Sequence, residues 1–171
     1  MRKLDFTVGV IAAMKMEAED IISAMTDITE REISGIRFCT GKLYGINCVT
    51  AVCGIGKVFA AVCAQTMILE YAPDLIINTG VAGTLTEKLS IGDIIIADKL
   101  VQHDMDTSAL GDPVGMISGI NLVYLPCSGE YSELLMTAAE DLDRVKRLRG
   151  TIASGDRFMC DSTEKKRVLS L

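Results

Sequence analysis

The chain has 171 residues, of which 49% are hydrophobic and 23% are charged. This balance is typical of a soluble globular protein, and the length allows one domain that buries about 70% of its unfolded surface. The net charge is −6 and no dense Lys/Arg cluster occurs, which argues against nucleic-acid binding. The apolar runs are interrupted well short of a membrane span, which argues against a transmembrane segment.

The six cysteines include no C-x-x-C pair. Residues 1–7 lack the apolar core of a signal peptide, so we expect a cytoplasmic protein. Because thiols stay reduced in that compartment, we expect reduced and mostly buried cysteines.

In chain order, the first elements alternate between strand and helix. Residues 8–12 form a buried strand, and apolar residues at helical spacing then predict an amphipathic helix over residues 14–25. The next segment, residues 36–44, is typical of an antiparallel hairpin that leads into a further strand. Glycine turns are expected in it at Gly35, Gly41 and Gly45.

The stretch from residue 49 to residue 83 organises the rest of the chain. A strand at 49–53 ends in a glycine turn, and the helix that follows at 57–71 is so apolar that we expect burial on more than one side. The apolar run at 75–77 predicts a parallel strand, with a second glycine turn after it. Two such turns are expected to share one carboxyl edge of the sheet, where open α/β sheets bind ligands.

The second half of the chain is predicted to contain two more strands and two helices. The strands are expected at 91–101 and 151–153, and a surface helix between them at 131–147. The segment 102–129 is rich in Gly, Ser, Asp and Pro, which predicts a long functional or disordered loop. Asp161 offers N-cap chemistry for a final helix. No repeat or linker interrupts the chain, so residues 1–171 are predicted to form a single domain.

Some residues suggest a catalytic or metal-binding role, but each also has a simpler structural interpretation. Glu17 lies in the first turn of the helix after a strand, and a solvent-exposed glutamate at the helix dipole is the simpler one. His103, Asp104 and Asp106 are metal-type ligands, but no second cluster completes a site. A His–Asp pair that orders the loop is favoured over a metal site, and no metal is predicted. The glycine turns match neither a dinucleotide nor a P-loop fingerprint, so no cofactor is expected.

Six short motifs occur in one order along the chain: V-G-V-I-A-A-M-K-M-E, C-G-I-G-K-V, I-N-T-G-V-A-G, I-G-D-I-I-I-A-D, H-D-M-D and I-A-S-G-D-R-F. Together they resemble the bacterial 5′-methylthioadenosine/S-adenosylhomocysteine nucleosidases of the nucleoside phosphorylase-like superfamily, from residue 8 to about residue 168. The resemblance implies an α/β fold, a three-layer α/β/α sandwich with a mixed central sheet. It also implies a homodimer.

The resemblance assigns a role to Glu17 and to residues around an adenine nucleoside. Glu17 matches the glutamate that positions and deprotonates the attacking water, which replaces the solvent-exposed interpretation. The nucleoside contacts implied are Ala13 and Met14 at the ribose, Ile55 at the alkylthio end, Ala82 and Gly83 beside purine and ribose, Phe158 stacked on adenine, and Met159 reading the adenine edge through its backbone. Leu110 stands near the place where a dimer partner contributes an apolar, usually aromatic, residue.

The chemistry of N-ribosyl cleavage fits this assignment. It requires a base that activates water and an acid that protonates the purine, across an oxocarbenium-like transition state. Phosphorylase relatives carry an arginine before the second glycine turn to hold phosphate, whereas residues 76–80 here have no cation. We therefore expect water as the nucleophile.

The resemblance also implies that two elements lie beyond residue 171. They are the M-E-M-E segment, whose glutamate holds the ribose hydroxyls, and the S-D segment, whose aspartate is the acid. We therefore expect an incomplete nucleosidase domain that lacks its C-terminal strands and helices and whose activity by itself is doubtful. Two alternatives stay open: another N-ribosyl hydrolase, such as one acting on aminofutalosine, and a non-catalytic purine-binding or oligomer-forming remnant.

Overall fold

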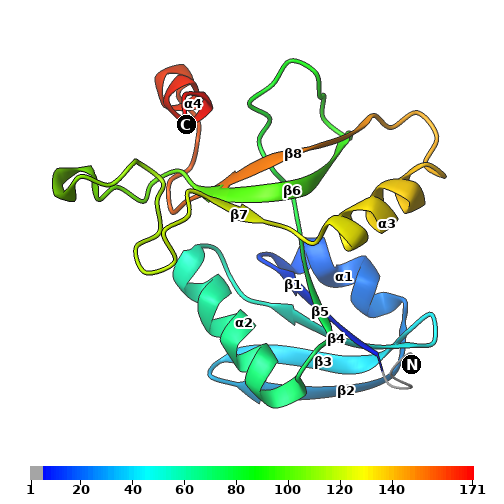
Figure 1. The fold of residues 1–171 in the computed structure, drawn as a ribbon. Coiled ribbons are helices and arrows are strands. Elements are labelled where there is room, and N and C mark those ends of the chain that lie inside the picture. The colour runs from blue at the N-terminus through cyan, green and yellow to red at the C-terminus, as the bar shows by residue number, and fades with distance from the viewer. Residues whose placement is uncertain (1–5) are drawn as a thin grey trace. The chain divides into compact units, whose positions relative to one another are not determined.

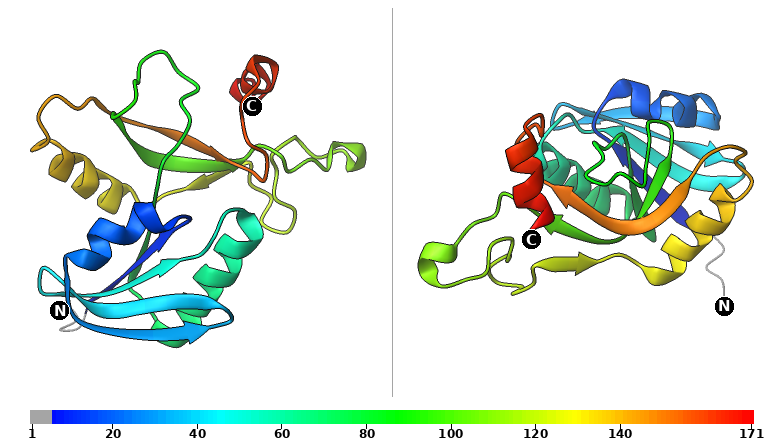
Figure 2. Two further views of the ribbon diagram at one scale, coloured as in Figure 1. Left: turned by 180° about the vertical axis from the view of Figure 1, so that it is seen from behind. Right: turned by 90° about the horizontal axis from the view of Figure 1, so that it is seen from above.

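A computed structural model describes residues 6–171, so part of the stretch 1–7 that lacks a signal-peptide pattern lies outside the described residues. The chain divides into two compact units, Met1–Ala82 and Gly83–Leu171, called here the N-terminal and the C-terminal unit. The elements of each unit can be followed in the ribbon views (Figure 1 and Figure 2). The predicted organisation as a single domain stays a prediction.

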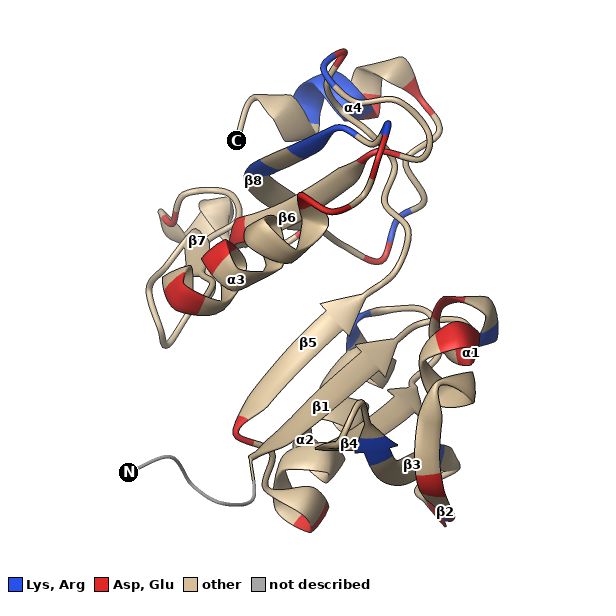
Figure 3. Cartoon of the chain, turned by 90° about the vertical axis from the view of Figure 1, so that its right-hand side faces the viewer, with Lys and Arg blue, Asp and Glu red and all other residues tan. Residues whose placement is uncertain are grey.

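The N-terminal unit is a mixed five-stranded sheet with two helices, in the strand order β2-β3-β4-β1-β5. Its elements are β1 (Thr7–Ala12), α1 (Lys15–Ser23), β2 (Met25–Ile33), β3 (Ile36–Leu43), β4 (Ile46–Val52), α2 (Lys57–Tyr71) and β5 (Leu75–Thr79). β1 pairs in parallel with both β4 and β5, and the three arrows run the same way in Figure 3. β2, β3 and β4 are antiparallel neighbours.

The carboxyl ends of the three parallel strands are level with one another. Ala12, the last residue of β1, pairs with Val52 of β4 on one side and with Thr79 of β5 on the other. The glycine turns that begin at Gly54 and Gly80 therefore leave the sheet at one edge. This confirms the arrangement predicted from the two strand–glycine patterns.

The sheet is covered by a helix on each face. Successive strand residues point to opposite sides of the sheet, so alternate residues pack against different helices. Ile11, Val49 and Ala51 belong to a buried cluster with Met67 and Cys63 of α2. Their strand neighbours Val10 and Cys48 belong to a second cluster, against which Ile21 of α1 packs. The unit thus has helix, sheet and helix layers, as the predicted α/β/α sandwich requires.

Two predictions in the hairpin region are wrong. The helix predicted to residue 25 ends at Ser23, and Met25 begins β2, a strand that the sequence did not predict. β2 is an edge strand with mostly exposed residues, so it lacks the apolar alternation that marks a strand. Gly41 lies inside β3 and is not a turn: a Cβ there would lie 2.5 Å from the carbonyl oxygen of Thr26, so the glycine permits a close approach beside an irregular pairing.

Helix α2 has the predicted bounds but not the predicted burial. Only Cys63 and Met67 are buried, on the side that faces the sheet. The other apolar side chains are largely exposed, and the helix carries few charges (Figure 3). The exposed apolar residues on it are Val58, Phe59, Val62, Ile68 and Leu69. We call this set the α2 apolar face.

The C-terminal unit contains a three-stranded sheet in the order β7-β6-β8, with β6 parallel to β8 and antiparallel to β7. Its elements are β6 (Ile94–Gln102), the 3₁₀ helix η1 (Ser108–Leu110), β7 (Tyr124–Pro126), α3 (Gly129–Ala139), β8 (Arg147–Ser154) and α4 (Ser162–Leu169). The Ser132 hydroxyl of α3 donates to the Ala97 carbonyl of β6 at 2.8 Å, which ties the helix to the sheet.

The structure corrects the predicted elements of this unit in three places. β6 starts at Ile94 rather than at residue 91, after a turn in which the Asp93 carboxylate accepts from two backbone N–H groups. The predicted loop 102–129 contains η1 and β7. The helix predicted over 131–147 ends at Ala139, whose carbonyl accepts from the Arg147 guanidinium at 2.6 Å; Arg147 itself begins β8.

The predicted N-cap of the last helix is confirmed. The Asp161 carboxylate accepts from the Thr163 backbone N–H at 2.8 Å, at the start of α4. None of the helices in the part of the chain that the structure describes is both long and apolar enough to span a bilayer.

A matched pair of methionine substitutions tests the packing of α2. Met67 is fully buried between α2 and the sheet, whereas Met16 on α1 is 75% exposed. Truncating a buried methionine leaves a cavity, so Met67→Ala should lower the free energy of unfolding by about 2–5 kcal/mol. Met16→Ala should change it by less than about 0.5 kcal/mol. Urea denaturation of both variants checks this, and equal effects would contradict the packing described.

Candidate functional site

Glu17 lies at the carboxyl edge of the N-terminal sheet, in the first turn of α1. Helix α1 starts directly after β1, with Met14 as its N-cap residue. The Glu17 carboxylate turns back over this junction: its Oε2 accepts from the backbone N–H groups of Ala13 and Met14, each at 2.9 Å. Its Oε1 accepts from the backbone N–H of Val81 at 3.0 Å. The solvent-exposed interpretation of Glu17 is therefore wrong.

These three bonds connect two segments that are far apart in the sequence. Ala13 and Met14 follow β1, and Val81 follows β5, which pairs with β1. A carboxylate suits this position because both of its oxygens are acceptors and all three of these partners are N–H donors. The N-terminal end of a helix also favours a negative charge. We call the three bonds the Glu17 clamp.

Gly80 and Cys53 lie near the Glu17 carboxylate. Gly80 approaches the carboxylate so nearly that a Cβ there would lie 2.8 Å from Oε1. Cys53 ends the neighbouring strand region, and its backbone N–H donates to the Ala12 carbonyl at 2.9 Å. Burial raises the pKa of the Cys53 thiol, and the negative charge of Glu17 raises it further. The thiol therefore stays protonated near neutral pH and is a poor nucleophile.

The other predicted residues of the N-terminal unit follow the same sheet edge. Ala13 and Met14 are half-buried at the β1–α1 junction. Ile55 lies in the glycine turn after β4 and is 75% exposed, and Ala82 follows the Glu17-bound Val81 and is exposed. The structure thus brings Ala13, Met14 and Glu17 into direct contact and places Ile55 and Ala82 in the turns of that edge.

The remaining predicted residues belong to the C-terminal unit. Phe158 follows β8 and its side chain is 95% exposed, whereas Met159 is half-buried. Gly83 and Leu110 are exposed, Leu110 at the end of η1. Because these residues and Glu17 lie in different units, their placement around one adenine nucleoside stays a prediction. A cavity of about 440 Å³ in this unit, lined by Asp106, Val114, Arg167, Ser170 and Leu171, includes none of the predicted site residues.

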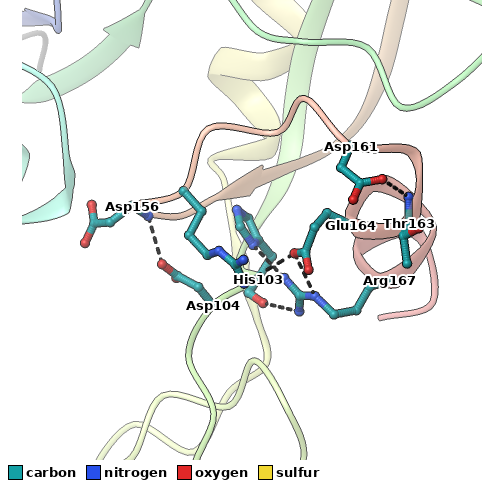
Figure 4. A network of polar contacts seen from close by, with 8 residues as sticks. His103, Asp104, Asp156, Asp161, Thr163, Glu164 and Arg167 are labelled. Carbon is teal, nitrogen blue, oxygen red and sulfur yellow. Dashed lines mark hydrogen bonds and ion pairs between the residues drawn. The ribbon is translucent and has the colours of Figure 1, made fainter.

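The segment around His103 is ordered by contacts with β8 and α4, as Figure 4 shows. His103 is buried, and its backbone N–H donates to the Ser154 carbonyl at 2.9 Å. The Arg167 guanidinium of α4 donates to the His103 carbonyl at 2.9 Å and lies 3.4 Å from the ring Nδ1. Asp104 accepts from the Asp156 backbone N–H at 2.8 Å.

These contacts order the loop through Ser154, Asp156 and Arg167, and none of them is the predicted His–Asp pair, which stays a prediction. They join the end of β6 to the turn after β8, which leads to Phe158. In the part of the chain that the structure describes, no group of three or more His, Cys, Asp and Glu side chains is arranged to hold a metal ion.

The sequence did not identify Gly80, Val81 and Arg167 as partners of candidate residues. From the sequence, Gly80 and Val81 are recognisable only as part of a glycine turn, and Arg167 only as part of the last helix. The available signal is a glycine directly after an apolar strand, which marks a close approach of the backbone. It gave no indication that the approaching group is the Glu17 carboxylate, because that contact spans 64 residues.

Comparisons with known proteins agree with the resemblance. A family model described as the phosphorylase superfamily matches residues 7–171. A 5′-methylthioadenosine/S-adenosylhomocysteine nucleosidase of Shewanella loihica is 38% identical over 163 residues, which is 95% of this chain and 70% of the relative.

Solved structures show the same fold. The nucleosidase of Neisseria meningitidis, in complex with methylthio-immucillin-A, is 34% identical with a TM-score of 0.92, over 96% of this chain and 71% of that one. The nucleosidase of Colwellia psychrerythraea, in complex with adenine, is 28% identical with a TM-score of 0.93, over 99% and 70%. A futalosine hydrolase mutant of Helicobacter pylori is 30% identical with a TM-score of 0.90, over 96% and 74%.

These similarities confirm the predicted fold, a nucleoside phosphorylase-like α/β sandwich. The match runs through both units and includes the strand ends that carry Glu17, Gly80 and the turn after β8. On this evidence the chain belongs to the phosphorylase superfamily and, within it, to the 5′-methylthioadenosine/S-adenosylhomocysteine nucleosidases.

Proposed function

We propose that this chain serves the hydrolysis of the N-ribosyl bond of 5′-methylthioadenosine and S-adenosylhomocysteine, with Glu17 as the base that activates water. The observation that carries the proposal is the Glu17 clamp: a carboxylate oriented by three backbone N–H groups at the ligand-binding edge of an open sheet. We place this reaction in the cytoplasm, as part of methionine salvage.

The chemistry requires a fixed base more than a strong one. Water attacks the anomeric carbon while the purine departs, and the base must be aimed at the water as the oxocarbenium-like charge develops. A carboxylate that is hydrogen-bonded to backbone groups after two strands is already oriented. No free energy is then spent on reorienting it in the transition state. This supports Glu17, rather than the buried and protonated Cys53 thiol, as the reactive group.

Water is favoured over phosphate as the nucleophile. A phosphate dianion needs cationic or multiple N–H partners. The segment before the second glycine turn, residues 76–80, carries no positive charge. The backbone N–H of Val81 in this turn already donates to Glu17, so it is not available to a phosphate.

The proposed ligand is a small-molecule adenine nucleoside. The exposed Phe158 ring is available for stacking, which contributes about 1–3 kcal/mol per base. The relatives from Neisseria and Colwellia are complexes with methylthio-immucillin-A and with adenine. In this proposal Met159 contacts the adenine edge, Ala13, Met14, Ala82 and Gly83 contact the ribose side, and Ile55 contacts the alkylthio group.

A second candidate is hydrolysis of a futalosine-type nucleoside. The similarity to the Helicobacter pylori futalosine hydrolase mutant favours it. Both reactions use the same bond type and the same base, so a panel of methylthioadenosine, adenosylhomocysteine and aminofutalosine separates them by the relative values of kcat/KM.

The test of Glu17 uses residues 1–171 alone and a chimaera that adds the part of the Shewanella loihica relative that the match leaves uncovered. In the chimaera, Glu17→Gln should lower kcat by about 10²–10⁴ because the base is lost. Adenine release, followed by absorbance with a coupled oxidase, measures kcat, and calorimetry measures binding of the nucleoside, which should stay nearly unchanged.

Glu19→Gln is the matched control, because Glu19 lies on the same helix and is exposed. It should retain the kcat of the unsubstituted chimaera. A Glu17→Gln variant that also retains this kcat would remove Glu17 from the mechanism. The same assay on residues 1–171 alone measures whether this chain by itself releases adenine.

We also propose that the protein is a homodimer whose interface includes the α2 apolar face. Val58, Val62 and Leu69 are spaced by four and seven residues, so they lie along one side of the helix. Their side chains are 73%, 42% and 73% exposed. Apolar surface of this kind marks association sites in soluble proteins, and two copies related by a two-fold axis bury the same patch on each.

Charge introduced on this face should break the dimer. We expect a dimer by light scattering at micromolar concentration, and a monomer when Val62→Asp and Leu69→Asp are combined, because the charges would be buried without partners. Leu134→Asp is the control, since Leu134 lies on α3 and is 64% exposed. A wild-type monomer, or a double variant that stays dimeric, would contradict the proposal.

A further inference from the structure

The three bonds of the Glu17 clamp occupy the two carboxylate oxygens unequally. Oε2 accepts from two backbone N–H groups, those of Ala13 and Met14, whereas Oε1 accepts, within residues 6–171, only from the N–H of Val81. Each carboxylate oxygen has two lone-pair directions. Among the described residues, Oε2 is therefore saturated and Oε1 keeps one direction open.

The bond from Val81 depends on the residue before it. A Cβ at Gly80 would lie 2.8 Å from Oε1, 3.0 Å from Cδ and 3.2 Å from Oε2 of Glu17. Carbon atoms do not approach so closely, so any side chain at this position must push the carboxylate away or move the backbone. By contrast, a Cβ at Gly83 or Gly129 would meet no atom within 4 Å.

We propose that Gly80 is a positioning residue for the reaction: its lack of a side chain lets Glu17 reach the Val81 N–H, which leaves Oε1 as the one oxygen able to take the proton of the attacking water. This inference rests on the proposed function for the reaction itself. The clamp does not depend on that function and can be tested apart from it.

The proton balance of the step is simple. The water oxygen forms a bond to the anomeric carbon, the N-ribosyl bond breaks with its electron pair going to the purine, and one water proton goes to Oε1. The purine takes its proton from a general acid or from water. Oε2 takes no part because both of its lone pairs hold backbone N–H groups.

Displacing the carboxylate should affect turnover more than substrate binding. A base that is misplaced by about 1 Å can cost about 10²-fold in rate, while contacts to the nucleoside are retained. In the chimaera, Gly80→Ala should therefore lower kcat by about 10²-fold and change KM by no more than a few-fold.

The clamp itself is tested in the 171-residue chain by amide hydrogen exchange, without any activity. In Gly80→Ala the Val81 amide should exchange about tenfold to a hundredfold faster, because it loses a hydrogen bond to a charged group. Gly129→Ala, the matched control, should leave the Val81 amide unchanged.

A double-mutant cycle separates the clash from a general loss of packing. With Glu17→Ala the obstructing carboxylate is gone, so adding Gly80→Ala should cause no further change at Val81. If Gly80→Ala alone fails to fold, the double variant should fold again for the same reason.

Each outcome has a defined meaning. Unchanged exchange at Val81 in Gly80→Ala, additive effects in the cycle, or a double variant that does not fold would overturn the clamp. If the cycle shows coupling and kcat falls without a matching change in KM, the inference stands. If the cycle shows coupling but the unsubstituted chimaera releases no purine from any nucleoside of the panel, the clamp stands and the proposed function fails.

Discussion

The candidate site depends on one pairing pattern: β1 runs parallel to both of its neighbours and ends level with them. Ala12 pairs with Val52 and with Thr79, so three strand ends lie in one line. A parallel arrangement places the turns after these strands at the same edge, which an antiparallel pair would not do. Without this pattern, the N–H of Val81 would not come within reach of a carboxylate on α1.

The hydrogen bonds of the Glu17 clamp have a structural role and, in the proposed function, a chemical role. Its bonds hold the first turn of α1 against the exit of β5, so the carboxylate stabilises the edge on which it lies. In the proposed function, the same bonds also direct the carboxylate towards a water molecule at the open lone pair. Any substitution of Glu17 therefore changes the packing of this edge, and stability has to be measured together with turnover.

Particular residues show where reasoning from the sequence succeeds and where it stops. The bounds of α2 and the Asp161 cap were predictable because helical composition and N-cap chemistry act over a few residues. β2 was not predictable because an exposed edge strand needs no apolar alternation. The outer side of α2 was predicted to be buried, but it is exposed. Composition shows that its side chains are apolar, but it does not show which neighbour covers them.

The sequence by itself determined most of the strands and helices in their order, though not β2, η1 or β7, the two glycine turns at one sheet edge and, through six motifs, the family. These properties follow from local patterns, each contained within a short stretch of chain. Only the tertiary structure decided that Glu17 is bound to Val81 and that Gly80 must lack a side chain to allow it. That contact joins residues 64 apart, and it exists because parallel pairing brings two strand ends together in space.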